Sequence, residues 1–269
     1  MIVLTFQPHA ALRPHVAQYL FMQSYEQSGP SFKMVPRNYP VFIFTSPEMP
    51  AVHNLIGKNH YPFEKGSVYY SGLGTDPSHM HIKENSTFIV VLLKPSHTGM
   101  FLREKAVAFT NHMEVITHMN PELRLLNEQL WQDHIPVTQQ INLIESYLIK
   151  LIHEPSRHFY ILRAMDAIHS TNGRITVNTL AEKAYTCPRN LQRLFREHVG
   201  VNPKEYVSMV RFNSFMKEFM TTPNTHIELL SEKYNYYDLS HLNKTFNRYL
   251  GTAPTFSILQ DQTINKLLV

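Results

Sequence analysis

The feature of this sequence that most limits its fold is an internal repeat in the last third of the chain. Residues 187–200, CPRNLQRLFREHVG, are followed 51 positions later by residues 238–251, DLSHLNKTFNRYLG, with leucine, phenylalanine and glycine at matching places. Upstream, LAEK at 180–183 matches LSEK at 230–233 at an offset of 50. A repeat of fixed period indicates a duplicated supersecondary unit. Each copy is predicted to be a helix, a turn and a second helix.

The second helix of each copy is predicted to have one apolar and one polar face. In the first copy the apolar positions have the spacing of a helical face, and they are Leu191, Leu194, Phe195 and Val199. The opposite face carries Arg189, Gln192, Arg193 and Arg196. Most charged helical faces are simply solvated. Here the polar face recurs in a second copy, and this duplication favours a binding surface.

Basic residues are concentrated in the same part of the chain. Residues 1–156 carry 11 Lys and Arg against 12 Asp and Glu, whereas residues 157–269 carry 14 against 9, which together make up the chain's 25 and 21. The net charge is therefore −1 for the first part and +5 for the second. A basic C-terminal part of this kind suggests a partner with phosphate groups.

The first part of the chain is strand-like before it becomes helical. Residues 38–112 contain apolar runs rich in β-branched and aromatic residues, namely VFIFT at 41–45, SVYYSGL at 67–73 and STFIVVLLKP at 86–95. From about residue 113 two helices are predicted, opened by Pro121 and Pro136. EPSR at 154–157 is interpreted as a linker. We therefore predict an α+β fold: a β-rich sensor and dimerisation domain at 1–156, helical over about 113–156, and an all-α domain at 157–269.

The repeat resembles the DNA-binding domain of the AraC/XylS family of transcriptional regulators over residues 158–259. The resemblance is carried by LAEKAYTCPRNLQRLFREHVGVNPKEYV, by YNYYDLSHLNKTFNRYLGTAPT, by Arg211 between them, and by the closing Phe246, Gly251 and Pro254. It implies two helix-turn-helix units joined by one long helix, opened by Pro203 and ending near Met220. It also implies a sequence-specific transcription regulator whose partner is double-stranded DNA.

The sequence departs from the family's pattern at three sites. Cys187 stands where a serine usually caps the outward helix, and cysteine caps poorly, at a cost of about 1 kcal/mol. Asn235 and Tyr236 replace the usual Gly-Phe of the second turn, although asparagine tolerates a positive φ well. Ser231 stands where alanine is usual. None of these residues prevents the fold.

The resemblance also assigns roles to exposed residues. The base-facing residues would be Arg189, Gln192 and Arg193 in the first unit and Ser240, His241, Asn243 and Lys244 in the second. Arginine can bond guanine O6 and N7 in the major groove, and glutamine or asparagine can bond adenine. Arg196 and Arg248 lie further along the same helices and would meet phosphate. Arg211 is interpreted as a structural ion-pair former.

The order of strands, then two helices, then the repeat resembles the usual domain order of AraC-type regulators. It implies a cupin-like barrel, a helical dimerisation element, and modulation by a small molecule or by dimerisation. An activator of this type would also contact RNA polymerase. Ile141, Ile144, Leu148 and Leu151 have heptad spacing and could form the seam of a homodimer. They could equally form the apolar face of a helix packed on its own barrel.

One motif suggests a different chemistry. HMHIKE at 79–84 places His79 and His81 alternately along a strand, with Glu84 nearby. A metal site needs three or four convergent ligands, and no second motif supplies them. We therefore predict no metal, no cofactor and no catalytic residue. The alternative is a cupin-like metal-binding protein or metalloenzyme with an appended DNA-binding domain.

The remaining signals concern location. The chain has one cysteine, Cys187, so it can form no internal disulfide, which suits a reducing compartment. The N-terminus lacks the basic and apolar regions of a signal peptide, and no apolar run reaches the roughly 18 residues needed to span a bilayer. We predict a cytoplasmic protein with no membrane contact.

Overall fold

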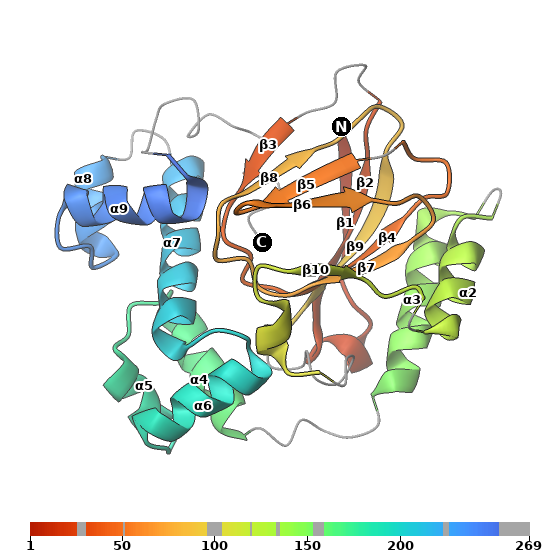
Figure 1. Ribbon diagram of the computed structural model, residues 1–269. Helices are drawn as coiled ribbons and strands as arrows, with labels where there is room; N and C mark the ends of the chain where they lie inside the picture. The colour runs from red at the N-terminus through yellow and green to blue at the C-terminus, as the bar shows by residue number, and fades with distance from the viewer. Residues whose placement is uncertain are drawn as a thin grey trace.

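The computed structural model describes residues 1–25, 31–50, 52–95, 104–118, 120–132, 135–152, 159–222 and 226–252. Its strands lie in the N-terminal part and its long helices follow them (Figure 1). The predicted α+β class is therefore confirmed. Of the motif that closes the repeat, Phe246 and Gly251 are described, whereas Pro254 lies outside the described residues.

The strands form two antiparallel sheets. Their bounds are β1 Ile2–Phe6, β2 Val16–Gln23, β3 Ser31–Met34, β4 Val41–Thr45, β5 Val52–Ile56, β6 Asn59–Phe63, β7 Val68–Ser71, β8 Ser78–His81, β9 Thr87–Leu93 and β10 Met113–Val115. The six-stranded sheet has the order β1-β2-β9-β4-β7-β10, and the four-stranded sheet has the order β3-β8-β5-β6. The runs predicted as strands are confirmed as β4, β7 and β9. The sequence pattern missed β1, β2 and β3, and β10 lies where a helix was expected.

The centre of the six-stranded sheet is buried on both faces, which explains the apolar run of β4. Val41 and Ile43 lie in a cluster shared with the four-stranded sheet. Phe42 and Phe44 lie in a second cluster on the opposite face. Successive side chains of a strand point to opposite faces, so a strand covered on both sides is apolar throughout. All five residues of β4 are buried.

Two helices, α2 (Pro121–Leu130) and α3 (Val137–Leu151), cover the outer face of the six-stranded sheet (Figure 1). Ile141, Ile144 and Leu148 of α3 are buried in the same cluster as the phenylalanines of β4, and Leu151 packs against it. These side chains cannot also form the seam of a homodimer, because their own sheet already covers them. The heptad interpretation is wrong, and the alternative of a helix packed on its own sheet is confirmed.

The C-terminal part is a helical domain built around one long helix. The bounds are α4 Phe159–Ser170, α5 Val177–Lys183, α6 Pro188–His198, α7 Pro203–Thr221, α8 Ile227–Lys233 and α9 Leu239–Leu250. The 19 residues of α7 span roughly 28 Å at 1.5 Å per residue, as predicted for the joining helix.

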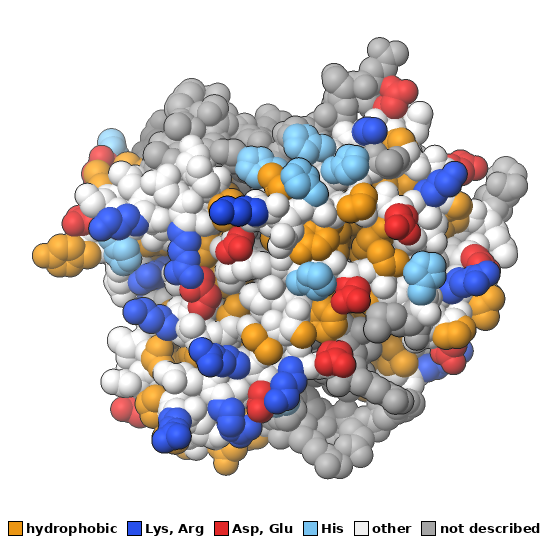
Figure 2. Space-filling model, in the orientation of Figure 1, with side chains coloured by type: hydrophobic (Ala, Val, Ile, Leu, Met, Phe, Trp, Pro, Cys, Tyr) orange, Lys and Arg blue, Asp and Glu red, His pale blue; other side chains and the backbone are white. Residues whose placement is uncertain are grey.

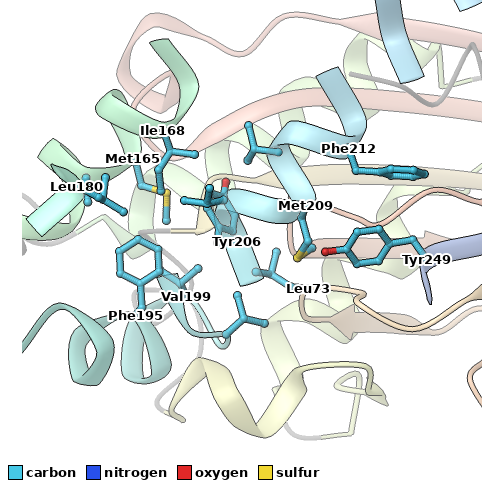
Figure 3. Packing of buried hydrophobic residues seen from close by; sticks show 14 of the residues in the cluster. Leu73, Met165, Ile168, Leu180, Phe195, Val199, Tyr206, Met209, Phe212 and Tyr249 are labelled. Atoms are coloured by element: carbon cyan, nitrogen blue, oxygen red, sulfur yellow. The ribbon is translucent and has the colours of Figure 1, made fainter. Parts of the chain in front are cut away.

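The repeated phenylalanines attach both units to α7. The Phe195 ring lies 6.2 Å from that of Tyr206, and the Phe246 ring lies 5.0 Å from that of Phe212. All four rings are fully buried. Figure 3 shows Phe195, Tyr206 and Phe212 in this core. The duplicated apolar positions therefore orient the two units on one shared helix.

The two turns share one backbone conformation. Asn235 has a φ of 56°, which confirms the expected left-handed residue in the second turn. Tyr185 has a φ of 55° at the matching place in the first turn, which the sequence did not predict. A bulky residue is uncommon in this region. Tyr185 is mostly exposed, and the guanidinium of Arg163 lies 5.2 Å from its ring.

The two domains meet through buried contacts. Val35 and Leu73 of the sheet domain belong to the same apolar cluster as the core of the first helical unit. Figure 3 shows Leu73 close to Tyr206. Nearby, the Asn213 amide on α7 donates a hydrogen bond of 2.7 Å to the carbonyl of Pro36. The helical domain is thus packed on the sheet domain rather than only tethered to it.

Candidate nucleic-acid interface

The polar face of α6 is presented to solvent as the sequence predicts. Leu191 and Phe195 are fully buried beneath it. The four polar residues of the face are all exposed: Arg189, Gln192, Arg193 and Arg196. Cys187 is the N-cap of α6, and its side chain accepts no capping hydrogen bond. The helix is therefore held by its apolar face and by α7 rather than by its cap.

Arg193 is the most constrained side chain of this face. Its Nη1 donates to Oε2 of Glu197 at 2.7 Å, and its Nη2 donates to Oδ1 of Asn190 at 3.0 Å. Both terminal nitrogens are thus engaged within α6. The two partners hold the guanidinium over the helix surface, and a base would have to compete with them.

The polar face of α9 is exposed in the same way. Its predicted base-facing residues all lie in solvent: Ser240, His241, Asn243 and Lys244. The carboxylate of Asp238 caps the helix by accepting from the His241 backbone N–H at 2.7 Å. The His241 ring lies edge-on to that of Tyr236, with 5.4 Å between centroids. This ring contact links the turn of the second unit to its outward helix.

The two residues predicted to meet phosphate differ in their surroundings. Arg196 is exposed, and no ion pair of Arg196 is found among the described residues. Arg248 forms a short ion pair with Glu205 of α7, and Glu205 also accepts from the Tyr249 hydroxyl at 3.0 Å. Burial, with Glu205 nearby, raises the pKa of Tyr249. Arg248 therefore has a structural partner in the free protein, while Arg196 is available to an anion.

Arg211 has a structural role, but among the described residues it does not form the ion pair expected from the sequence. Its guanidinium lies 4.9 Å from the centre of the Tyr236 ring, and its Nη1 reaches the carbonyl of Asn235 at 3.5 Å. Burial raises the pKa of Tyr236 to about 12. Arg211 thus connects the long helix to the turn of the second unit.

Two hollows run along the outward faces and share two bordering residues. The first, of about 620 Å³, is bordered by the four polar residues of α6, by Glu197, and by Lys105 and Val107 of the sheet domain. The second, of about 610 Å³, lies between α5, α7 and the His241–Arg248 face of α9. Asn202 and Lys204 border both hollows. The two outward helices therefore share one continuous basic surface, and Figure 2 shows Lys and Arg side chains spread over the helical domain.

Sequence reasoning missed Lys204 and Lys105 as members of this surface. Lys204 lies in the first turn of α7, where the helix dipole disfavours a cation. A lysine at such a position is a sequence signal for an anionic partner. Lys105 lies more than 80 residues before α6, and no local pattern connects them. The fold brings Lys105 there.

The histidine motif has a different place in the fold. His79 and His81 lie on β8, where they pair in register with Leu55 and His53 of β5. No group of three His, Cys, Asp or Glu side chains within the described ranges is placed to hold a metal ion. None of the helices that the structure describes is long and apolar enough to cross a membrane.

Comparison with known proteins adds family relationships. A helix-turn-helix domain profile matches residues 180–256, and a profile described as a domain of unknown function (DUF6597) matches residues 4–114. The HTH-type transcriptional activator AarP of Providencia stuartii is 31% identical over 96 residues, which cover 36% of this chain and 70% of AarP. The Msm operon regulatory protein of Streptococcus mutans is 26% identical over 150 residues, covering 55% of this chain and 53% of that protein.

A solved structure shares the whole fold. An apo variant of ToxT from Vibrio cholerae aligns with a TM-score of 0.51 over 89% of this chain and 96% of ToxT. The sequence identity is 11%, so this similarity concerns the fold alone.

Proposed function

The chain belongs to the AraC family of DNA-binding transcription regulators, and we propose that it reads one face of a DNA duplex with α6 and α9. Arg189, Gln192 and Arg193 contact base edges in one major groove. The second groove is read by Ser240, His241, Asn243 and Lys244. Arg196 contacts phosphate, and Arg248 is a weaker candidate for that role because Glu205 already holds it. The family is one of transcription regulators and not of enzymes.

The observation that carries this proposal is the shared border of the two hollows. Asn202 and Lys204 lie at the start of α7, between the outward faces of α6 and α9. Both faces therefore open on the same side of the domain. Grooves on one side of a duplex recur every 10–10.5 bp, or about 34 Å. A joining helix of roughly 28 Å, together with the width of the two units, suits this spacing.

The test begins by selecting bound sequences from a pool of random duplexes. The selected site should contain two blocks about one helical turn apart. Inserting roughly 5 bp between them turns the second block to the far side, and inserting about 10 bp restores the side but doubles the distance. Both insertions should reduce binding to the level of one block. Equal affinity for the selected site and the half-turn insertion would show that only one helix reads bases.

For the N-terminal domain we propose a cupin-like regulatory module that modulates DNA binding. Its two sheets enclose an apolar cluster that includes Met22, Met49 and Met113, and methionine adapts its shape readily to a lipophilic guest. A small-molecule effector would therefore be apolar in its main part. A ligand that binds the native state raises the melting temperature by mass action, so a thermal-shift screen of apolar compounds tests this idea.

Assembly and location are proposed on separate grounds. A homodimer would use the outer sides of α2 and α3, where Leu125 and Ile149 are exposed, and sedimentation analysis of the charged variant Leu125→Glu tests this.

The domain boundary is proposed to lie near residues 156 and 157, between α3 and α4. The single cysteine suits a cytoplasmic location. If the protein is an activator, RNA polymerase is its further partner.

A further inference from the structure

The sheet domain reaches the first outward helix through one short segment. The 3-10 helix η3 (Ala106–Phe109) lies beside α6 in Figure 1, in yellow between α6 and β10. Just after it, the Thr110 hydroxyl donates to the carbonyl of Gly200 at 2.8 Å. Gly200 has a φ of +98°, and a Cβ there would lie only 3.0 Å from the Ala106 carbonyl oxygen. Glycine at this position lets η3 approach the carboxyl-terminal end of α6.

Lys105 directly precedes η3, and its side chain remains in solvent. The ammonium lies 3.8 Å from Oε1 of Glu197, and 72% of the lysine side chain is exposed. Glu197 also accepts from Arg193 at 2.7 Å. An ion pair with this exposure contributes little. The ammonium can therefore leave Glu197 for a stronger anion at low cost.

The hollow that Lys105 borders is strongly basic. Its cationic lining residues are Lys105, Arg189, Arg193, Arg196 and Lys204. Of the described residues that line it, Glu197 alone is acidic. Such an excess of like charge along a concave surface concentrates anions. The cations come from the sheet domain, from α6 and from the start of α7, so they are spread along a surface rather than gathered at one point. This spread suits a chain of phosphates better than a single small anion.

The position of η3 along α6 indicates which part of a duplex Lys105 meets. In a helix-turn-helix unit the first residues of the outward helix contact base edges. Arg189 stands at that end of α6, whereas η3 lies at the opposite end, beside Gly200. The sugar-phosphate backbone borders the groove at that end. We propose that Lys105 contacts a phosphate of the duplex that α6 reads, so that the sheet domain forms part of the DNA-binding surface.

This inference rests on the proposed DNA reading, and its test needs no knowledge of the natural site. The full-length protein and Lys105→Gln are titrated with a random-sequence duplex of roughly 40 bp at increasing salt. Loss of one phosphate contact should make the negative slope of log affinity against log salt shallower by about 0.9. The ratio of wild-type to variant affinity should then shrink roughly 3.5-fold between about 50 and 200 mM salt. Lys65→Gln, at an exposed lysine of the sheet domain outside both hollows, is the matched control and should leave the slope unchanged.

Two results would overturn the inference. Tighter binding by Lys105→Gln would show that the segment obstructs the duplex, and an unchanged slope would leave Lys105 as a partner of Glu197 only. A wild-type protein that binds no DNA would instead refute the proposed function. On the selected site, the loss for Lys105→Gln should match the loss on random DNA, because a phosphate contact carries no sequence information.

Discussion

Replacing Arg193 with alanine should weaken binding to the selected DNA site much more than binding to random DNA. In the free protein, Arg193 donates to Glu197 at 2.7 Å and to Asn190 at 3.0 Å. A bidentate contact with guanine contributes about 1–3 kcal/mol of discrimination. Reaching the base means giving up an exposed i,i+4 pair worth about 0.3–0.5 kcal/mol. The net loss in the variant should therefore be about 0.5–2.5 kcal/mol, or roughly 2- to 70-fold in affinity.

The assay is fluorescence anisotropy with labelled selected and random duplexes at the same salt concentration. Arg124→Ala is the matched control, because Arg124 forms the same exposed i,i+4 pair, with Glu128 at 3.0 Å on α2. Both variants should lose a similar small amount of folding stability. Only Arg193→Ala should lose discrimination, and that loss should fall on one base pair. If Arg193→Ala weakened binding equally on both duplexes, Arg193 would be a phosphate contact and the base-reading assignment would fail.

Two further predictions concern stability. Cys187→Ser should stabilise the protein by about 0.5–1 kcal/mol and raise its melting temperature, because the hydroxyl can cap α6 where the thiol makes no bond. The control Cys187→Ala cannot cap the helix and should not raise the melting temperature. Equal melting temperatures for the two variants would contradict this prediction. At Glu218, chiefly the hydrogen bond from Lys233 and also that from the Tyr234 hydroxyl lower the carboxyl pKa from its ordinary 4.5. A lowered pKa stabilises the folded state above pH 4.5, and this contribution is lost as the pH falls through the folded pKa. Glu218→Gln should therefore be less stable than the wild type at pH 7 in denaturant titrations, and the difference should close in acid; a gap that stays constant with pH would refute the assignment.

The helical repeat could be predicted in detail because its signals are local. Apolar residues at helical spacing place Leu191 and Phe195 inside and Arg189 outside, whatever covers the inner face. Prolines fix the first turns of α6 and α7. Asn235 favours a left-handed backbone conformation in the second turn, and its φ is positive in the structure. These preferences act within a few residues, so they can be read without knowing the rest of the fold.

The helix α3 shows where local patterns stop. Heptad spacing identified the apolar face of Ile141, Ile144 and Leu148, but spacing alone does not say what covers that face. The sheet of the same chain covers it. Strand β10 was missed for a related reason: its three residues are too few for a periodic signal, and pairing with β7 determines their conformation.

The sequence by itself determined which side chains of the repeat are exposed, and hence the basic faces of α6 and α9. The tertiary structure decided the partners of those side chains. Glu205 reaches Arg248 across 43 positions, and Lys105 reaches Glu197 across 92. Helix periodicity is a local property of the backbone, whereas such pairs depend on how whole elements pack. The DNA surface was therefore predictable as a set of faces, while its extension onto the sheet domain required the folded molecule.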